Sequence, residues 1–216
     1  MEKFSTLTSP AAPLPEADVD TDIIFPARFL LLLDKAGLGK HLFHERRVRP
    51  DGTKTGFVLN TPPFDTAMIL VADANFGSGS SREQAVWALA DFGIRCVIAP
   101  SFGEIFYSNC FKNGVLPIVL TGEQHANVMS AARSGAPFTV DLEKQTVMPP
   151  NGPAITFEID PYRKRALMLG LDEIGGILAD DADDIAAFEA GHRRDQPWLF
   201  LDDGRLDQLF ADKEKA

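Results

Sequence analysis

The chain has 216 residues and 45% hydrophobic content, which is enough to build the core of one large domain or two small ones. Its net charge of −10, from 21 Lys+Arg against 31 Asp+Glu, argues against a nucleic-acid partner, because phosphate binding requires a basic face. No apolar run approaches the ~20 residues that span a bilayer, and the N-terminus lacks a signal-peptide layout, so we expect no membrane segment and a cytoplasmic location.

The first informative segment is "DVDTDIIFPARFL", residues 18–30, which places three acids around a threonine just before an apolar run. From the residues alone, it is typical of an Asx-rich turn that leads into a strand, or of a helix N-cap. Most leucines of the following "FLLLL", residues 29–33, are expected to belong to the core.

The middle of the chain alternates between strand and helix patterns. Residues 66–73 form a continuous apolar run of strand length, as expected for a strand covered on both faces. Apolar side chains then recur at helical spacing over residues 85–92, and Gly93 stands where a left-handed C-terminal cap would end the helix. A second apolar run, residues 94–100, completes a strand-helix-strand unit. An irregular helix and a further strand within residues 101–120 continue the alternation, which predicts an α/β fold with a buried parallel sheet.

The C-terminal part has a different pattern. Residues 137–160 contain two short alternating segments around a Pro-Pro-Asn-Gly-Pro turn, typical of a hairpin at a sheet edge or of a second β-rich layer. The sheet is therefore expected to be mixed, with a β-rich edge. A short helix with an acidic start is predicted over residues 181–191. We expect one domain over residues 1–190 and a polar tail over residues 191–216, to which the sequence assigns no role.

The loop "NFGSGSSRE", residues 75–83, lies between the first apolar strand and its helix. Such a loop presents unpaired backbone N–H groups and the positive end of the helix dipole, which favours an anion. A capping box, formed by Ser80 with Glu83 or by Ser81 with Gln84, would explain the helix start without any ligand. On local grounds the two interpretations have similar weight.

Two glycines and an arginine in this loop are left unexplained by a capping box. A phosphate-binding P-loop requires a lysine after the second glycine, where Ser80 stands, and a dinucleotide fingerprint requires a third glycine, where Arg82 stands. Arg82 can grip a carboxylate through two parallel hydrogen bonds. The loop therefore predicts binding of an organic acid rather than a nucleotide.

The cysteine content indicates no metal centre on this chain. Cys96 and Cys110 are the two cysteines, and neither belongs to a CxxC motif or has a histidine at metal-ligand spacing. Cys96 lies in an apolar run and is expected to be a small core residue. The sequence therefore predicts neither a disulfide framework nor a complete metal site.

Seven segments follow one another across roughly residues 14–190: "DVDTDIIFPARFL", "FVLN", "NFGSGSSRE", "WAL", "VIAPSFGEIFYSN", "NGVLPI" and "GLDEIG". Together they resemble the small subunits of 3-isopropylmalate dehydratase, which are equivalent to the swivelling C-terminal domain of aconitase-like hydro-lyases. The resemblance implies a β/β/α swivelling domain that binds no cofactor itself. It implies a partner, a separate large subunit that carries an iron–sulfur cluster.

The resemblance also implies an activity. Members of this family are hydro-lyases that act as a complex of both subunits, and they convert 2-isopropylmalate, a small dicarboxylic acid, into 3-isopropylmalate in leucine biosynthesis. Dehydration followed by rehydration needs a base for a carbon-bound proton and a Lewis acid for the departing hydroxyl group. The resemblance assigns the Lewis acid to the cluster of the large subunit.

Carried over residue by residue, the resemblance makes Ser80 the proton-abstracting base, activated by the helix N-terminus and by Arg82. The other implied positions are Ser81, Arg82, Asp22 and Thr21 at the substrate, with Gly77 and Gly79 in the loop backbone. No metal ligand is implied on this chain.

Three positions bear on the substrate. Gln84 and Ser78 stand where family members commonly have histidine and cysteine. In relatives that take a tricarboxylic homologue, an arginine occupies the position of Leu31, so an apolar group such as isopropyl is favoured here, with a discrimination of ~1–3 kcal/mol. Two alternatives remain open: the small subunit of another hydro-lyase that acts on an alkyl malate, maleate or citraconate-like acid, and a stand-alone anion-binding module.

Overall fold

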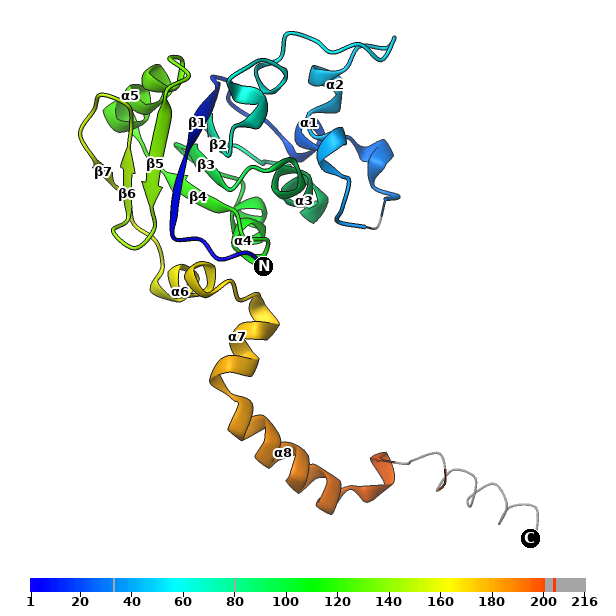
Figure 1. Cartoon of the computed structure of the whole chain (residues 1–216). Coiled ribbons are helices and arrows are strands. Elements are labelled where there is room, and N and C mark those ends of the chain that lie inside the picture. The colour runs from blue at the N-terminus through cyan, green and yellow to red at the C-terminus, as the bar shows by residue number, and fades with distance from the viewer. Residues whose placement is uncertain (33, 80, 201–203, 205–216) are drawn as a thin grey trace. The chain divides into compact units, whose positions relative to one another are not determined.

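The computed structural model describes residues 1–32, 34–79, 81–200 and 204 (Figure 1). Within these residues the strands form one seven-stranded sheet in the order β4-β3-β2-β1-β5-β6-β7. The strands are β1 (Thr6–Leu14), β2 (Ile69–Ala72), β3 (Cys96–Ala99), β4 (Leu116–Val119), β5 (Pro137–Asp141), β6 (Thr146–Met148) and β7 (Ile155–Thr156). Strands β1 to β4 are parallel, and β5, β6 and β7 add an antiparallel edge. The predicted α/β fold with a mixed sheet and a β-rich edge is confirmed.

The helices of the described residues are α1 (Thr21–Ile24), α2 (His44–Arg47), α3 (Glu83–Phe92), α4 (Glu104–Lys112), α5 (Gly122–Ala132), α6 (Pro161–Leu169), α7 (Glu173–Asp180) and α8 (Ala182–Asp195). Two short 3₁₀ helices matter below, η1 (Ala27–Phe29) and η2 (Gly39–His41). None of the helices described is long and apolar enough to cross a membrane.

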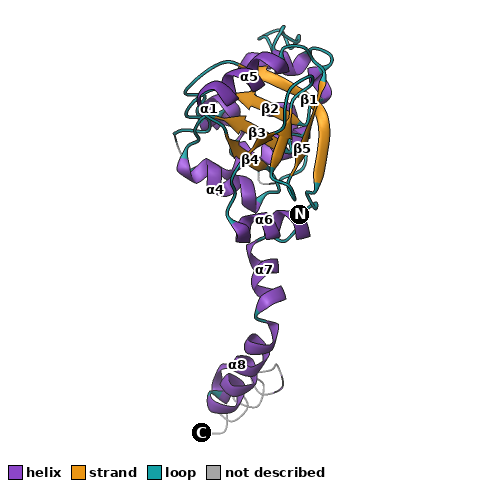
Figure 2. Ribbon diagram, turned by 90° about the vertical axis from the view of Figure 1, so that its left-hand side faces the viewer, coloured by secondary structure: helices purple, strands orange, loops and turns teal. Residues whose placement is uncertain are grey.

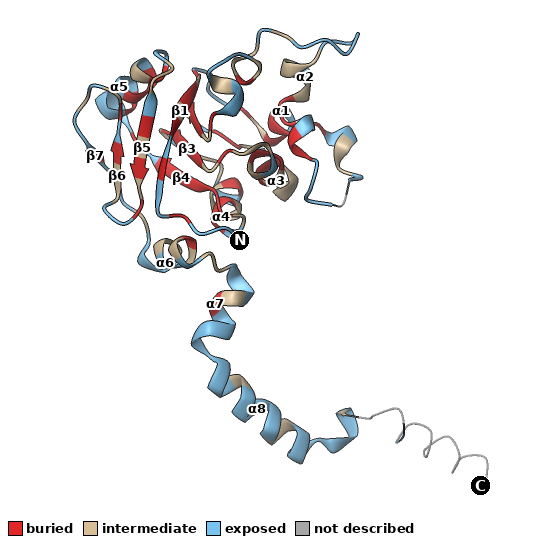
Figure 3. Cartoon of the chain, viewed as in Figure 1, coloured by how far each residue is buried: buried red, intermediate tan, exposed pale blue. Residues whose placement is uncertain are grey.

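Contacts divide the chain into two compact units, Met1–Asp172 and Glu173–Ala216. The first unit contains the sheet and α1 to α6, and the second contains α7 and α8. Helix α8 is largely exposed (Figure 3). The predicted domain limit at residue 190 stays a prediction.

Each face of the sheet has its own hydrophobic core, because successive side chains of a strand point to opposite faces. In β2, Leu70 and Ala72 join the cluster that includes the buried residues of α3, whereas Ile69 and Val71 join the cluster that includes those of α5. All four residues are fully buried. Figure 2 shows the parallel strands enclosed by helices, and Figure 3 shows that burial is concentrated in the strands. This rigid layer supports the loops that leave the strands.

Several predicted elements of the α/β core are confirmed. Helix α3 ends at Gly93, which adopts the left-handed conformation with φ 109°. Cys96 is fully buried in β3. The Pro-Pro-Asn-Gly-Pro turn joins β6 to β7, but β5 also pairs with β6, so residues 137–160 form three strands rather than two.

Other expectations are wrong. Of the two interpretations of residues 18–30, the helix N-cap is confirmed, because Asp20 caps α1, and the turn leading into a strand is wrong. The N-cap of α3 is Arg82, which makes no side-chain capping bond, so the box of Ser81 with Gln84 does not form; the box of Ser80 with Glu83 involves a residue outside the described ones. Leu31 and Leu32 are 89% and 40% exposed, against the expected core role.

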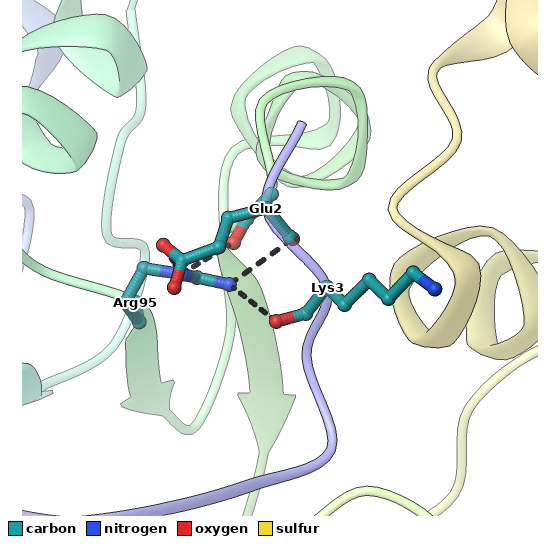
Figure 4. A network of polar contacts seen from close by, with 4 residues as sticks. Glu2, Lys3 and Arg95 are labelled. Carbon is teal, nitrogen blue, oxygen red and sulfur yellow. Dashed lines mark hydrogen bonds and ion pairs between the residues drawn. The ribbon is translucent and has the colours of Figure 1, made fainter.

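Arg95 fixes the N-terminal segment beside the sheet (Figure 4). Its guanidinium donates to the backbone carbonyls of Glu2, Lys3 and Gly114 at 3.3, 3.4 and 3.2 Å, and it pairs with the Glu2 carboxylate. The Arg95 side chain is only 12% exposed. The chain before β1 is therefore tied to the loops next to β3 and β4, on the other side of β2.

Candidate active site

The candidate site lies where three parallel strands end. In a parallel sheet the carboxyl ends of the strands share one edge, and this edge is where open α/β sheets bind ligands. The loops after β1, β2 and β3 run side by side there: Asp20 forms a parallel bridge with Ser78, and Phe76 forms one with Phe102. Segments far apart in the sequence are thus assembled into one surface.

Backbone hydrogen bonds join these loops. The Gly77 N–H donates to the Val19 carbonyl at 2.7 Å, and the Thr21 N–H donates to the Ser78 carbonyl at 2.9 Å. On the other side, the Phe76 N–H donates to the Ser101 carbonyl at 3.1 Å. Because the backbone of the middle loop is held on both sides, its position is set by the sheet rather than by its own sequence.

The glycines of the loop have separate structural reasons. Gly77 has φ 73°, and an added Cβ would lie 2.2 Å from Cγ of Phe106. Gly79 has φ 94°, but an added Cβ would meet only ordinary contacts, at 3.5 Å from Cβ of Asp20. Gly77 is required by both its conformation and the close approach of α4, whereas Gly79 is required by its conformation alone.

The three acids of "DVDTD" make three different contacts. Asp18 accepts a hydrogen bond from Nδ2 of Asn75 at 2.6 Å, which links the first loop to the second. Asp20 accepts from the Ile23 N–H at 2.8 Å and caps α1. Asp22 forms an ion pair with Arg82. The acids therefore build the site, and only the last one faces the candidate anion-binding group.

Arg82 stands at the N-terminus of α3, where unpaired N–H groups and the helix dipole favour an anion. Its side chain is 20% exposed, and its Nη1 atom forms the ion pair with the Asp22 carboxylate. Ser81 is exposed beside it. Glu83 does not compete for this cation, because its carboxylate accepts from Nδ2 of Asn113 at 2.8 Å.

The predicted site residues fall into three groups. The structure brings together Thr21, Asp22, Gly77, Gly79 and Arg82 through the contacts above, and Thr21 is buried with 2% exposure. Leu31 follows η1 and is 89% exposed, so the described part of the chain does not cover it. Ser80 lies outside the described residues, and its role stays a prediction.

Sequence reasoning missed several residues that build the site. The Asp18–Asn75 pair and Gly103 hold the loops together; an added Cβ at Gly103 would lie 2.4 Å from the Gly77 carbonyl oxygen. It also missed two histidines, His41 and His44, that pack around Phe29. Their H-x-x-H spacing was the available signal, but no chemistry in the sequence connected it to Phe29.

The described residues do not fit an iron–sulfur cluster on this chain. Among them no three His, Cys, Asp or Glu side chains are grouped to hold a metal ion. Cys96 and Cys110 are fully buried, and burial raises the pKa of both thiols, which disfavours the thiolate that a cluster needs.

Comparison with known proteins agrees with this geometry. A family model described as the aconitase C-terminal domain matches residues 1–123, and a model described as LeuD_N matches residues 129–161. A third model, described as the C-terminal domain of the 3-isopropylmalate dehydratase small subunit, matches residues 180–202. The chain is 55% identical over 202 residues to a 3-isopropylmalate dehydratase small subunit of Paramagnetospirillum magneticum, covering 92% of this chain and 100% of the relative.

Two further relatives extend the comparison. A protein of the same description from Gluconacetobacter diazotrophicus is 55% identical over 201 residues, covering 92% of this chain and 97% of the relative. A crystal structure of 3-isopropylmalate dehydratase from Methanocaldococcus jannaschii has a TM-score of 0.64 at 27% identity, covering 84% of this chain and 99% of that one.

The mixed sheet, its loop-built edge and the match over residues 1–123 define an aconitase-type domain of the hydro-lyase class. Relatives of more than 50% identity cover nearly the whole chain. The chain belongs to the family of 3-isopropylmalate dehydratase small subunits.

Proposed function

We propose that this chain is the small subunit of a 3-isopropylmalate dehydratase that converts 2-isopropylmalate into 3-isopropylmalate in the cytoplasm, as part of leucine biosynthesis. The single observation that carries the proposal is the ion pair of Asp22 with Arg82 at the N-terminus of α3, beside the loop that contains Gly77. It is found in a chain that belongs to this family. A small dicarboxylic acid fits a helix N-terminus with an adjacent arginine.

Residue roles follow from this arrangement of Asp22 and Arg82. Arg82 and Ser81 are proposed to bind one substrate carboxylate, with Thr21 and Asp22 beside them and with Gly77 and Gly79 shaping the loop. Arg82 is partly buried, which strengthens its attraction to an anion compared with a fully solvated arginine. Asp22 needs a separate explanation, because its negative charge repels a carboxylate; we propose that it acts by orienting Arg82.

The chemical step is assigned to Ser80. As base, its oxygen takes the proton from the carbon next to the one that bears the hydroxyl group, the carbon–carbon double bond forms, and the hydroxyl leaves. Addition of water with the opposite orientation gives the isomer. A serine hydroxyl is a weak base, and the dipole of α3 together with Arg82 would stabilise its alkoxide form.

The large subunit is proposed to complete this site and to carry the iron–sulfur cluster. The described residues of the chain offer no ligand set for the cluster. Leu31 supports the same division, because this leucine is 89% exposed among the residues that the structure describes. We propose that the substrate's alkyl group and the large subunit cover it.

The test is an anaerobic assay with the purified chain, its large subunit, and the two combined, each after cluster reconstitution. The absorbance of the unsaturated intermediate is followed with isopropylmalate, citraconate and dimethylmalate as substrates. Turnover by the combination alone, highest on isopropylmalate, is the expected result. Higher turnover of another acid would contradict the substrate, and substrate binding without the large subunit would contradict the shared site.

A further inference from the structure

Two histidine rings hold Phe29 at the end of η1, outside the loops of the candidate site. The His41 ring stacks on the Phe29 ring with 4.0 Å between centroids and 20° between planes. The His44 ring meets Phe29 edge-on at 5.0 Å, and the two histidine rings are 5.9 Å apart. The position of Phe29 is thus set by rings from η2 and α2.

Phe29 in turn sets the course of the next residues. The Leu32 N–H donates to the Phe29 carbonyl at 3.0 Å, and the Leu30 N–H donates to the Ala27 carbonyl at 3.1 Å. These bonds fold residues 30–32 into a turn on η1, and Leu31 projects from this turn into solvent. A shift of the Phe29 ring would therefore move Leu31.

The surroundings of the His41 ring favour the neutral form of histidine. Nδ1 of His41 and Nδ1 of His44 are both buried and have no hydrogen-bond partner. A neutral imidazole can leave one nitrogen as a bare acceptor, but a charged imidazole carries a proton on both nitrogens. Protonation would place an unsatisfied, charged N–H in a buried position, which is the costly case.

The charges around His41 add to this preference. The charged or titratable groups that act on it are Lys40 from η2, His44 from α2 and Arg28 from η1. The neighbouring elements also carry Glu45 and Arg47 on α2 and Asp91 on α3. Both carboxylates have other partners: Glu45 pairs with Arg28 at 2.6 Å, and Asp91 accepts from the Gly39 N–H at 2.7 Å. Burial, followed by the positive charges of Lys40, His44 and Arg28, lowers the pKa of His41.

We propose that His41 is a positioning residue: its neutral ring holds Phe29, and through it the turn of residues 30–32 that carries Leu31, and protonation of the ring releases that turn. The inference rests on the proposed function only in its second half, the effect on substrate. Its first half, the link between His41 and Leu31, concerns this chain alone.

The link within the chain is tested by NMR on the full chain with labelled leucine methyl groups and histidine rings. We expect the Leu31 methyl signals to move with the midpoint of the His41 titration. They should stay fixed in His41→Phe, which keeps a ring on Phe29 but cannot be protonated, and still move in the control His192→Phe on α8. The proposal would be overturned by Leu31 methyl signals that do not follow the His41 midpoint in the native chain. It would equally be overturned by signals that titrate in His41→Phe as they do in the native chain.

The effect on substrate is tested with the complex of both subunits. As the pH falls through the His41 titration, KM for isopropylmalate should rise roughly fivefold, a ratio within the range measured for loss of one aromatic pair, with a smaller change in kcat. The rise should be absent in His41→Phe and present in His192→Phe. A KM that is independent of pH in an active native complex would overturn the link to the site. A native complex without isopropylmalate turnover would contradict the proposed function instead, and the methyl titration would still decide the link from His41 to Leu31.

Discussion

Asp22 and Arg82 form an ion pair that joins the start of α1 to the start of α3. The arginine side chain is 20% exposed and the aspartate side chain 53%, so the pair lies at the surface with the cation on its inner side. A guanidinium carries five donors, so one arginine can bind Asp22 and a substrate carboxylate together. The pair thus supports a role for Asp22 in orienting Arg82 rather than in binding substrate.

This role predicts strong coupling between the two residues. Asp22→Asn should leave the free energy of unfolding within ~1 kcal/mol, because exposed ion pairs contribute little. KM for isopropylmalate should rise roughly fivefold, the effect of losing about 1 kcal/mol of carboxylate binding. A double-mutant cycle with Arg82→Lys measures the coupling, and Arg133→Lys, an exposed arginine, is the matched control. Additive effects of the two changes would argue against an orienting role.

The contact between Gly77 and Phe106 predicts a large loss of stability in Gly77→Ala. The new methyl group would overlap the Phe106 ring and would also require a left-handed alanine, which together cost ~2–5 kcal/mol. Gly37→Ala is the control, because Gly37 has φ 84° but an added Cβ would meet nothing within 4 Å. It should lose only the ~1–2 kcal/mol of the backbone term. Equal losses in urea unfolding would refute the steric account.

Part of this architecture could be predicted from the sequence, because some patterns depend on local chemistry alone. Gly93 ends α3 since a left-handed cap favours glycine, and the apolar runs of β2 and β3 are buried on both faces, as is β4 up to its last residue. Strand β1 was missed, because Pro10, Pro13 and its alanines are poor strand formers. The strand forms because each half of it has a pairing partner: residues 6–10 pair with β5, and residues 11–14 pair with β2.

The site was predictable only where one motif carried the chemistry. The glycine-serine loop and Arg82 could be found from local residue types, but the contact of Asp22 with Arg82 depends on how the sheet aligns two loops. The stacking of His41 on Phe29 is of the same kind, since it joins two 3₁₀ turns that sequence periodicity does not reveal. Most leucines of residues 29–33 were expected in the core and Leu31 at the substrate, and tertiary structure leaves Leu31 exposed.

Glu16 and Arg46 predict a dependence of stability on pH. Arg46 donates to both carboxylate oxygens of Glu16, at 2.5 and 2.6 Å, and these hydrogen bonds lower the pKa of Glu16 below its ordinary value of 4.5. The stabilisation is therefore complete above pH 4.5 and is lost as the pH falls through the lower pKa of the folded state. Because the side chains are 38% and 36% exposed, we expect less than ~1 kcal/mol.

Urea unfolding of Glu16→Gln measures this contribution. The variant should be less stable than the native chain at pH 7, and the difference should close in acid. Glu158→Gln, an exposed glutamate on the loop after β7, is the control and should change stability little at either pH. A difference that grows as the pH falls would contradict the sign of the Glu16 pKa shift.

Leu31 predicts a separation of stability from substrate preference. Leu31→Ala should keep the free energy of unfolding within ~0.5 kcal/mol, because an exposed leucine leaves no cavity. In the complex, kcat/KM for isopropylmalate should fall about tenfold relative to that for citraconate, whose alkyl group is smaller. Leu169→Ala, at another exposed leucine, should change neither the free energy of unfolding nor the ratio of the two kcat/KM values. A uniform fall for both acids would show that Leu31 does not contact the alkyl group.

Turnover by Ser80→Ala in the assembled two-subunit enzyme tests the central claim most directly, with Ser130→Ala on the exposed face of α5 as the matched control. If this chain provides the base, kcat should fall by about 10²–10⁴-fold while the two chains still assemble and KM changes little, and the control should keep native kcat. A Ser80→Ala complex with native kcat would contradict the account, because the loop between β2 and α3 would then hold no catalytic group at that position.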